Sequence, residues 1–303
     1  VSAEQGIVSA QPGVASAQDD VWSANNENRD SIVKDKAVAR QSFPTEFKLF
    51  NLNIELLKTR LMSITDQRLV VNGNVPSTTI LLPNAAGGLE RFEVYEASNF
   101  EPALQAQFPD IRAFSGKGLD DPYAMLKLSL SPQGIQTTVF RAGAVSEYIE
   151  PFSLDRTVYA VFAKSRERGQ LPWACTTEER NLMTSINSQV LDARLPESSA
   201  GQIRTLRLVQ SVNGEYSNFF GASTAGTPAD QALVAAAINA TLARTNGTYE
   251  KDLAVHLDLT ANTTLVWFYN PATDPYTTLG NWNNELAAAI AAAGITPAMY
   301  DIG

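Results

Sequence analysis

Alternation of apolar and polar residues dominates the chain between residues 45 and 163. Residues 47–54 and 89–95 both show the two-residue period that is typical of a half-buried strand. Residues 79–83 form a short apolar run, and the Asn-Ala-Ala-Gly-Gly turn that follows predicts a hairpin over 79–95. The remaining elements expected here are helices at 54–64 and 101–108 and strands at 111–114, 124–130, 134–140, 145–149 and 157–163. Many short strands at close spacing predict an antiparallel β-rich domain over residues 41–163.

After residue 201 the pattern changes to strands that alternate with helices. Thr227, Pro228 and Asp230 indicate a helix start, because threonine caps a helix, proline fits its first position and an acid suits its first turn. We expect this helix to run to about residue 245, or as far as Glu250. Its apolar stripe is expected to comprise Leu233, Ala237, Ile238, Leu242 and Tyr249. The other expected elements are strands at 203–212, 253–260 and 265–269 and a helix at 285–293 that ends at Gly294. This order predicts an α/β layer with a crossover connection.

The predicted fold class is therefore a multidomain α+β protein. Residues 1–40 are polar, with Trp22 as the one large apolar anchor, and are expected to be a disordered leader. Residues 164–201 are expected to be a linker with one short helix near 181–191. One long helix and two or three strands are few for a stable α/β sandwich, so the domain over 202–303 is expected to be incomplete and the parent protein to continue.

Composition excludes several classes of partner. The chain has 303 residues, 44% of them hydrophobic, and its net charge is −9. An acidic surface repels nucleic-acid phosphates, so no nucleic-acid partner is expected. The sequence contains no apolar run of about 20 residues, which predicts no membrane span. The chain begins with Val1, which is consistent with a removed signal peptide or with a fragment. Composition makes no prediction of the oligomeric state.

The chain contains one cysteine, Cys175, and one histidine, His256. A structural zinc site usually takes four Cys or His ligands, and a catalytic one takes about three protein ligands. Neither can be assembled from the Cys and His residues of this chain. A single cysteine also excludes an internal disulfide.

Eight short segments, in order over about residues 45–303, resemble the reprolysin-like metzincin proteases of secreted bacterial proteins. The segments are Phe108-Pro-Asp-Ile-Arg112, Ser115-Gly-Lys-Gly-Leu-Asp-Asp-Pro122, Tyr148-Ile-Glu-Pro151, Arg204-Thr-Leu-Arg-Leu208, Gly214-Glu-Tyr216, Asn246-Gly-Thr-Tyr-Glu-Lys-Asp-Leu-Ala254, Ala272-Thr-Asp-Pro-Tyr276 and Tyr300-Asp-Ile-Gly303. The resemblance implies a β-rich propeptide domain over 41–163 and the first part of a protease domain over 202–303. It also implies secretion.

In such proteases the zinc-binding helix, H-E-x-x-H-x-x-G-x-x-H, follows the Tyr-Asp-Ile-Gly segment, and its glutamate is the general base for the zinc-bound water. This motif is absent from the chain. The resemblance therefore implies that zinc is bound by residues downstream, and that this chain holds no catalytic or cofactor-binding residue. The parent would be a zinc endopeptidase acting on protein or peptide substrates, and the chain alone is expected to be inactive.

Cys175 is the candidate metal ligand. In related metzincins a propeptide thiolate can occupy the open zinc position and keep the enzyme latent. This sequence lacks the glycine that would follow the cysteine. Two other interpretations stay open, namely a disulfide to a downstream cysteine and an inert thiol.

Several other polar residues have both a structural interpretation, which is the expected one, and a functional alternative. His256 and Asp258 are predicted on the more polar face of a strand, opposite Val255, Leu257 and Leu259, and a metal role for His256 is the alternative. Asp274 is expected to cap a turn, with a structural calcium as the alternative. The remaining candidates are glycosylation triplets at Asn239, Asn246 and Asn262, acid pairs at Asp120-Asp121 and Glu178-Glu179, and a processing site at Arg166–Arg168. For these, solvated or unmodified residues are the expected outcome.

A second function of a different class fits the same pattern. A secreted β-rich adhesion or binding module with an appended α/β domain would need no catalytic residue. The discriminating feature is an H-E-x-x-H motif downstream of Gly303, which the protease requires and the module lacks.

Overall fold

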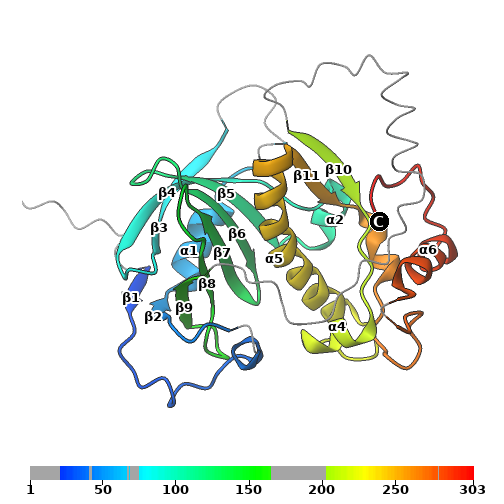
Figure 1. The fold of residues 1–303 in the computed structure, drawn as a ribbon, viewed down its shortest axis with the longest axis horizontal. Coiled ribbons are helices and arrows are strands. Elements are labelled where there is room, and N and C mark those ends of the chain that lie inside the picture. Colours follow the sequence, from blue (N-terminus) through cyan, green and yellow to red (C-terminus); the bar gives the residue numbers. More distant parts are fainter. Residues whose placement is uncertain (1–20, 41–42, 67, 69–74, 165–202, 279) are drawn as a thin grey trace, which may run out of the picture.

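The computed structural model describes residues 21–40, 43–66, 68, 75–164, 203–278 and 280–303 of the chain. These residues form two units that lie side by side (Figure 1). The β-rich unit comprises the described residues up to 164, and the C-terminal unit comprises residues 203–303. The long helix α5 (Pro228–Leu253) lies between the large sheet and the strands of the C-terminal unit.

The β-rich unit is built around one antiparallel sheet of nine strands in the order β1-β2-β9-β8-β7-β6-β5-β4-β3. The strands are β1 (Trp22–Ala24), β2 (Lys48–Leu52), β3 (Ser77–Pro83), β4 (Leu89–Glu96), β5 (Arg112–Gly118), β6 (Met125–Ser131), β7 (Gly134–Phe140), β8 (Glu147–Pro151) and β9 (Val158–Ala163). Consecutive strands from β3 to β9 are neighbours. The predicted antiparallel β-rich organisation and the hairpin over 79–95 are therefore confirmed.

The sheet curls until it is nearly closed. Its outer strands β1 and β3 contact each other, and α1 (Ile54–Met62) packs against β3. Leu57 and Leu61 of this helix are fully buried, in one core with Leu82, Phe92 and Tyr159 from the strands. Alternation along the strands thus places one set of side chains inside the curl.

Part of the expected leader belongs to the folded unit, so that prediction is wrong for residues 21–40. Trp22 lies in β1, which pairs with β2, and a 3-10 helix follows at Lys36–Ala39. The Trp22 ring is 4% exposed and meets the Tyr159 ring edge to face, with the centroids 5.8 Å apart. Trp22, together with buried Val21 and the pairing of β1 with β2, therefore anchors a polar segment to the sheet edge.

The C-terminal unit begins with a crossover. Strand β10 (Arg204–Leu208) leads through α4 (Gly214–Phe219) and α5 to β11 (Val255–Leu259), which pairs with β10 in parallel. Helix α6 (Trp282–Ala292) packs beyond this pair, and Gly294 follows it with φ +71°. The predicted α/β layer is confirmed, and so is the start of α5, where Thr227 and Asp230 form a reciprocal capping box.

Helix α5 is buried on more than the single stripe that was expected. Residues 234–240 are all buried, whereas Leu233 is partly exposed and Tyr249 is exposed. The reason is that α5 contacts β5, β6 and β7 on one side and β11 on the other. Small alanine side chains let both layers approach the helix, so its apolar surface extends around the axis.

Two strand predictions in this unit need correction. The expected strand at 265–269 is replaced by a 3-10 helix (Ala261–Val266) followed by one bridge between Val212 and Trp267. The Thr263 hydroxyl accepts from the Gln210 N–H and donates to the Gln210 carbonyl, which stabilises this turn instead of a strand ladder. The second correction concerns the strand expected over residues 203–212, which ends at Leu208 because Gln210 makes these bonds with Thr263.

Within the described residues, no helix is long and apolar enough to cross a membrane.

Candidate functional site

The connection between β4 and β5, residues 97–111, leaves the large sheet and enters the C-terminal unit. Its residues 99–101 lie along the outer edge of β11: the Leu259 N–H donates to the Asn99 carbonyl at 2.7 Å, and the Glu101 N–H donates to the Leu259 carbonyl at 2.9 Å. Phe100 thereby forms a parallel bridge with Leu259. The β-rich unit thus covers the backbone of an edge strand that belongs to the other unit.

Apolar side chains of the same connection complete the core of the C-terminal unit. Phe100, Leu104, Phe108 and Ile111 are buried in one cluster with side chains of α5, of β11 and with Trp267. Helix α2 (Pro102–Gln107) carries Leu104. The rings of Phe108 and Trp267 stack with their centroids 6.2 Å apart. We call this whole contact region between the two units the junction.

Three buried asparagines bond to one another in the junction. Asn99 donates to the Asn239 side-chain oxygen at 2.9 Å, and Asn246 donates to the Asn99 side-chain oxygen at 2.9 Å. Asn239 also donates to the Arg112 carbonyl, and Asn246 bonds to both backbone groups of Leu257. Buried polar groups need partners, and each side chain here has them on the other unit or within its own. Asn239 and Asn246 are therefore buried in the folded chain, where a glycosylating enzyme cannot reach them. This agrees with the expectation that both residues are unmodified.

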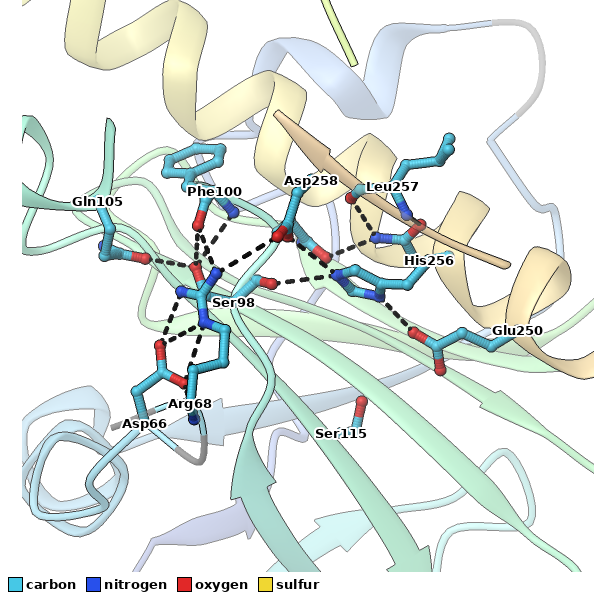
Figure 2. A network of polar contacts seen from close by, with 12 residues as sticks. Asp66, Arg68, Ser98, Phe100, Gln105, Ser115, Glu250, His256, Leu257 and Asp258 are labelled. Carbon is cyan, nitrogen blue, oxygen red and sulfur yellow. Dashed lines mark hydrogen bonds and ion pairs between the residues drawn. The ribbon is translucent and has the colours of Figure 1, made fainter. Parts of the chain in front are cut away.

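The polar centre of the junction is His256 on β11 (Figure 2). Its Nδ1 lies 2.7 Å from a carboxylate oxygen of Glu250 on α5, and its Nε2 lies 3.2 Å from the Ser98 carbonyl. Asp258 Oδ1 lies 3.3 Å from Nε2 as an ion-pair partner. Since both ring nitrogens face only acceptors, the doubly protonated imidazolium fits this environment best. The predicted placement of His256 and Asp258 on the polar face of the strand is confirmed.

Cations from the β-rich unit meet these carboxylates. Lys127 on β6 donates to Glu250 and, at 2.6 Å, to the Ser115 hydroxyl of β5. Arg68 pairs with Asp258 at 3.5 Å, with Asp66 at 2.7 Å, and donates to the Phe100 carbonyl. Arg68, Ser115, Glu250, His256 and Asp258 of this network line a cavity of about 210 Å³, together with Tyr95, Ala97, Ser98, Ile203 and Thr205.

Opposite charges in this buried network shift the pKa values of its members. Burial disfavours the charged imidazolium, but Asp258 and Glu250 outweigh it and raise the pKa of His256 to about 9. Burial also acts on Glu250, yet His256 and Lys127 hold the pKa of this carboxyl below its usual value. For Lys127 burial prevails, and its pKa is lowered in spite of Glu250.

Ser115 and Lys127 have the composition of a nucleophile and base pair, but their environment opposes that chemistry. A general base must be unprotonated to accept the serine proton. Glu250 bonds the Lys127 ammonium directly and the amine donates to the hydroxyl, so the hydroxyl acts as an acceptor. The geometry is that of a structural ion pair in which the ammonium also donates to the Ser115 hydroxyl.

The described residues do not form a zinc site. Within that part of the chain, no three His, Cys, Asp or Glu side chains are grouped so that they could hold a metal ion. His256 has both ring nitrogens engaged, as shown above. Cys175 lies outside the described residues, so its role as a latency ligand stays a prediction. The same holds for Arg166–Arg168, Glu178-Glu179 and the helix near 181–191.

Other candidates have structural partners. Asp274 accepts from the Tyr276 N–H at 3.0 Å and from the Gly214 N–H at 2.7 Å, which confirms the turn-cap interpretation. Asp120 pairs with Arg91, and Asp121 pairs with Arg141, so these adjacent acids serve two different arginines.

A second cavity, of about 470 Å³, lies at the C-terminal end of β10. It is lined by Leu208, Val209, Gln210, Ser211, Val212, Asn213, Tyr216, Tyr276, Trp282, Asn283, Leu286, Ile302 and Gly303. None of these side chains carries a charge at neutral pH. Its lining suits apolar contacts, and its titratable side chains are the phenols of Tyr216 and Tyr276.

The protonated state of His256 predicts loss of stability in alkali. Its folded pKa of about 9 exceeds the value of 6.5 expected when unfolded, so its contribution is fully present below pH 6.5 and is lost as the pH rises through 9. Between pH 7 and 10 we expect the free energy of unfolding to fall by about 1–3 kcal/mol on this account. Denaturant unfolding at several pH values measures the fall.

The control is His256→Gln, which cannot titrate. Lys127 and Tyr95 also line this region and titrate in alkali, so the relevant quantity is the difference between the two pH profiles. A variant whose stability falls as steeply as that of the unmodified chain would contradict the assignment to His256.

Sequence analysis missed Arg68, Ser98, Asn99 and Lys127 as members of this network. One signal was present, since Lys127 and Ser129 alternate with Leu126, Leu128 and Leu130 along β6. Because both faces of β6 are buried, the polar face that this alternation indicates must be covered by another element, and that element is α5. Arg68 and Asn99 carry no comparable local pattern.

Comparison with known families identifies the C-terminal unit. Residues 203–303 match the family described as Metallo-peptidase family M12B, Reprolysin-like. No curated protein and no solved structure matches the chain. The matched residues coincide with the unit that carries β10, α5, β11 and α6. Residues 203–303 are therefore similar to the reprolysin-like M12B metallopeptidases.

Proposed function

We propose that this chain is the N-terminal portion of a secreted zinc-dependent endopeptidase precursor. In this proposal the β-rich unit is the propeptide domain, and residues 203–303 are the first part of the protease domain. The observation that carries the proposal is the family match over 203–303, since it begins where the α/β layer begins and leaves the β-rich unit outside it.

The proposed reaction is hydrolysis of peptide bonds in protein or peptide substrates. In metallopeptidases zinc supplies an activated water for that attack. The described residues do not provide its ligands, so in the proposal those ligands belong to the rest of the parent protein. In this proposal the role of the chain is structural. Strands β10 and β11 and helix α5 form the layer on which the remaining protease domain would be built. Residues 99–101 cover the outer edge of that layer.

The test uses the parent protein encoded by the complete reading frame, with the 303-residue chain as control. We expect the parent to retain zinc in stoichiometric amount and to cleave an unfolded protein substrate after processing between the units. The chain alone should do neither. A parent that binds no zinc and cleaves no peptide bond would refute the proposal and favour a binding function.

A further inference from the structure

The two units share one apolar core although they are far apart in sequence. Phe100, Leu104 and Phe108 come from the β-rich unit, and they are buried among side chains of α5 and against Trp267. Without residues 97–111 these helix and strand surfaces would be exposed to water. An apolar surface of this kind stabilises association in proportion to the area it removes from water.

Polar contacts in the junction are buried and paired across it. Asn99 contacts Asn239 and Asn246, Lys127 contacts Glu250, and Arg244 of α5 contacts Glu150 of β8 at 3.2 Å. Glu150 and Lys127 are almost fully buried. Because such pairs are shielded from solvent, added salt weakens them far less than it weakens surface pairs.

Close packing leaves little space between α5 and the sheet. A Cβ atom placed on Gly247 would lie 2.4 Å from Cε2 of Phe140 on β7 and 3.0 Å from Cγ of Lys127 on β6. The helix backbone therefore contacts the sheet of the β-rich unit directly, which only glycine permits at this position.

We propose that the junction is an interaction surface whose partner is the chain's own β-rich unit, and that the two units stay bound as a one-to-one complex after the chain is cut between them. Backbone bonding of residues 99–101 to β11, the shared core and the buried ion pairs do not require a covalent link between residues 164 and 203. Cleavage alone then does not separate the β-rich unit from the reprolysin-like segment. The proposal rests on the proposed function only for the biological meaning of that cleavage.

The test is a cut at one defined position in the full chain. A recognition sequence for a site-specific protease is inserted after Ser199, and the folded chain is cleaved to completion. We expect size-exclusion chromatography at micromolar concentration to give one peak that contains both fragments in equal amounts. The peak should persist in about 1 M NaCl, because the paired charges are buried. Separate elution or precipitation of either fragment in neutral buffer would overturn the proposal.

Variants identify the surface that holds the complex. Gly247→Leu would force Phe140 and Lys127 away from α5, and we expect the cut fragments to bind at least about tenfold more weakly. Tyr249→Leu is the matched control, because Tyr249 lies on the same helix but is exposed, so its change should leave binding unaltered. Equal affinities for these two variants would place the contact elsewhere and contradict the proposal.

Asn99→Ala is the second variant, in case Gly247→Leu fails to fold before the cut. It removes the donor to the Asn239 side-chain oxygen and the acceptor of one Asn246 N–H, both of them buried, and should also weaken binding about tenfold. Unchanged affinity would count against the asparagine network as part of the surface. None of these measurements needs peptidase activity, so the result is separate from the test of the proposed function.

Discussion

Replacing Glu250 by glutamine is expected to lower the free energy of unfolding by about 3–5 kcal/mol. Among the residues that the structure describes, Glu250 is the one carboxylate that contacts both Lys127 and His256, and the side chain of Lys127 is only 5% exposed. Glutamine keeps the shape of the side chain and some hydrogen bonds but removes the charge. A buried ammonium and an imidazolium then lie next to a neutral amide, which is far more costly than the loss of a surface ion pair. Denaturant unfolding at pH 7 gives the value.

The same helix provides a control for the charge change. Asp252 pairs with Lys251 at 3.4 Å, and both side chains are 53% exposed. Asp252→Asn should change stability by no more than about 0.5 kcal/mol, because exposed ion pairs contribute little. Adding Lys127→Met to Glu250→Gln should restore part of the loss, since it removes the unpaired ammonium. If the Glu250 and Asp252 variants are equally stable, the buried ion pair is not what stabilises the junction.

Replacing Phe100 by alanine is expected to cost about 3–5 kcal/mol of stability in the whole chain. Phe100 is 1% exposed, and its ring lies in the shared core next to Phe108, with the ring centroids 6.5 Å apart. The cavity left by the ring would lie in the C-terminal unit although the residue belongs to the β-rich unit. We therefore expect the midpoint of denaturant unfolding, monitored by circular dichroism, to shift to a lower denaturant concentration for both units.

Phe219→Ala is the comparison for this change. Phe219 lies at the end of α4 and is 53% exposed, so its truncation should cost less than about 1 kcal/mol. Loss of stability in the β-rich unit alone after Phe100→Ala would show that the side chain serves only its own unit. That outcome would contradict the shared core.

Sequence patterns predicted the elements whose formation is local. The alternation in β2 and β4, the turn between β3 and β4, and the helix start at Thr227 each depend on residues within a few positions, and the structure confirms them. The family of residues 203–303 was also indicated correctly by short ordered segments.

The features that sequence patterns did not predict depend on partners far along the chain. Asn99 and Asn246 are 147 positions apart, and neither lies in a motif that names the other. Asn239 and Asn246 matched a modification triplet, which conceals their structural role. The burial of α5 on several sides was also missed, because a helical stripe assumes one core and this helix has neighbours on both sides.

The connection at residues 97–111 has a consequence for how such proteins can recombine during evolution. A gene fusion made at the boundary before residue 203 would join a new upstream domain to the reprolysin-like segment, but would remove residues 99–101, which cover the edge of β11. It would also remove the rings that fill the space beside Trp267. We expect viable exchanges to carry an equivalent of this connection with them, or to change Asn239 and Asn246 at the same time.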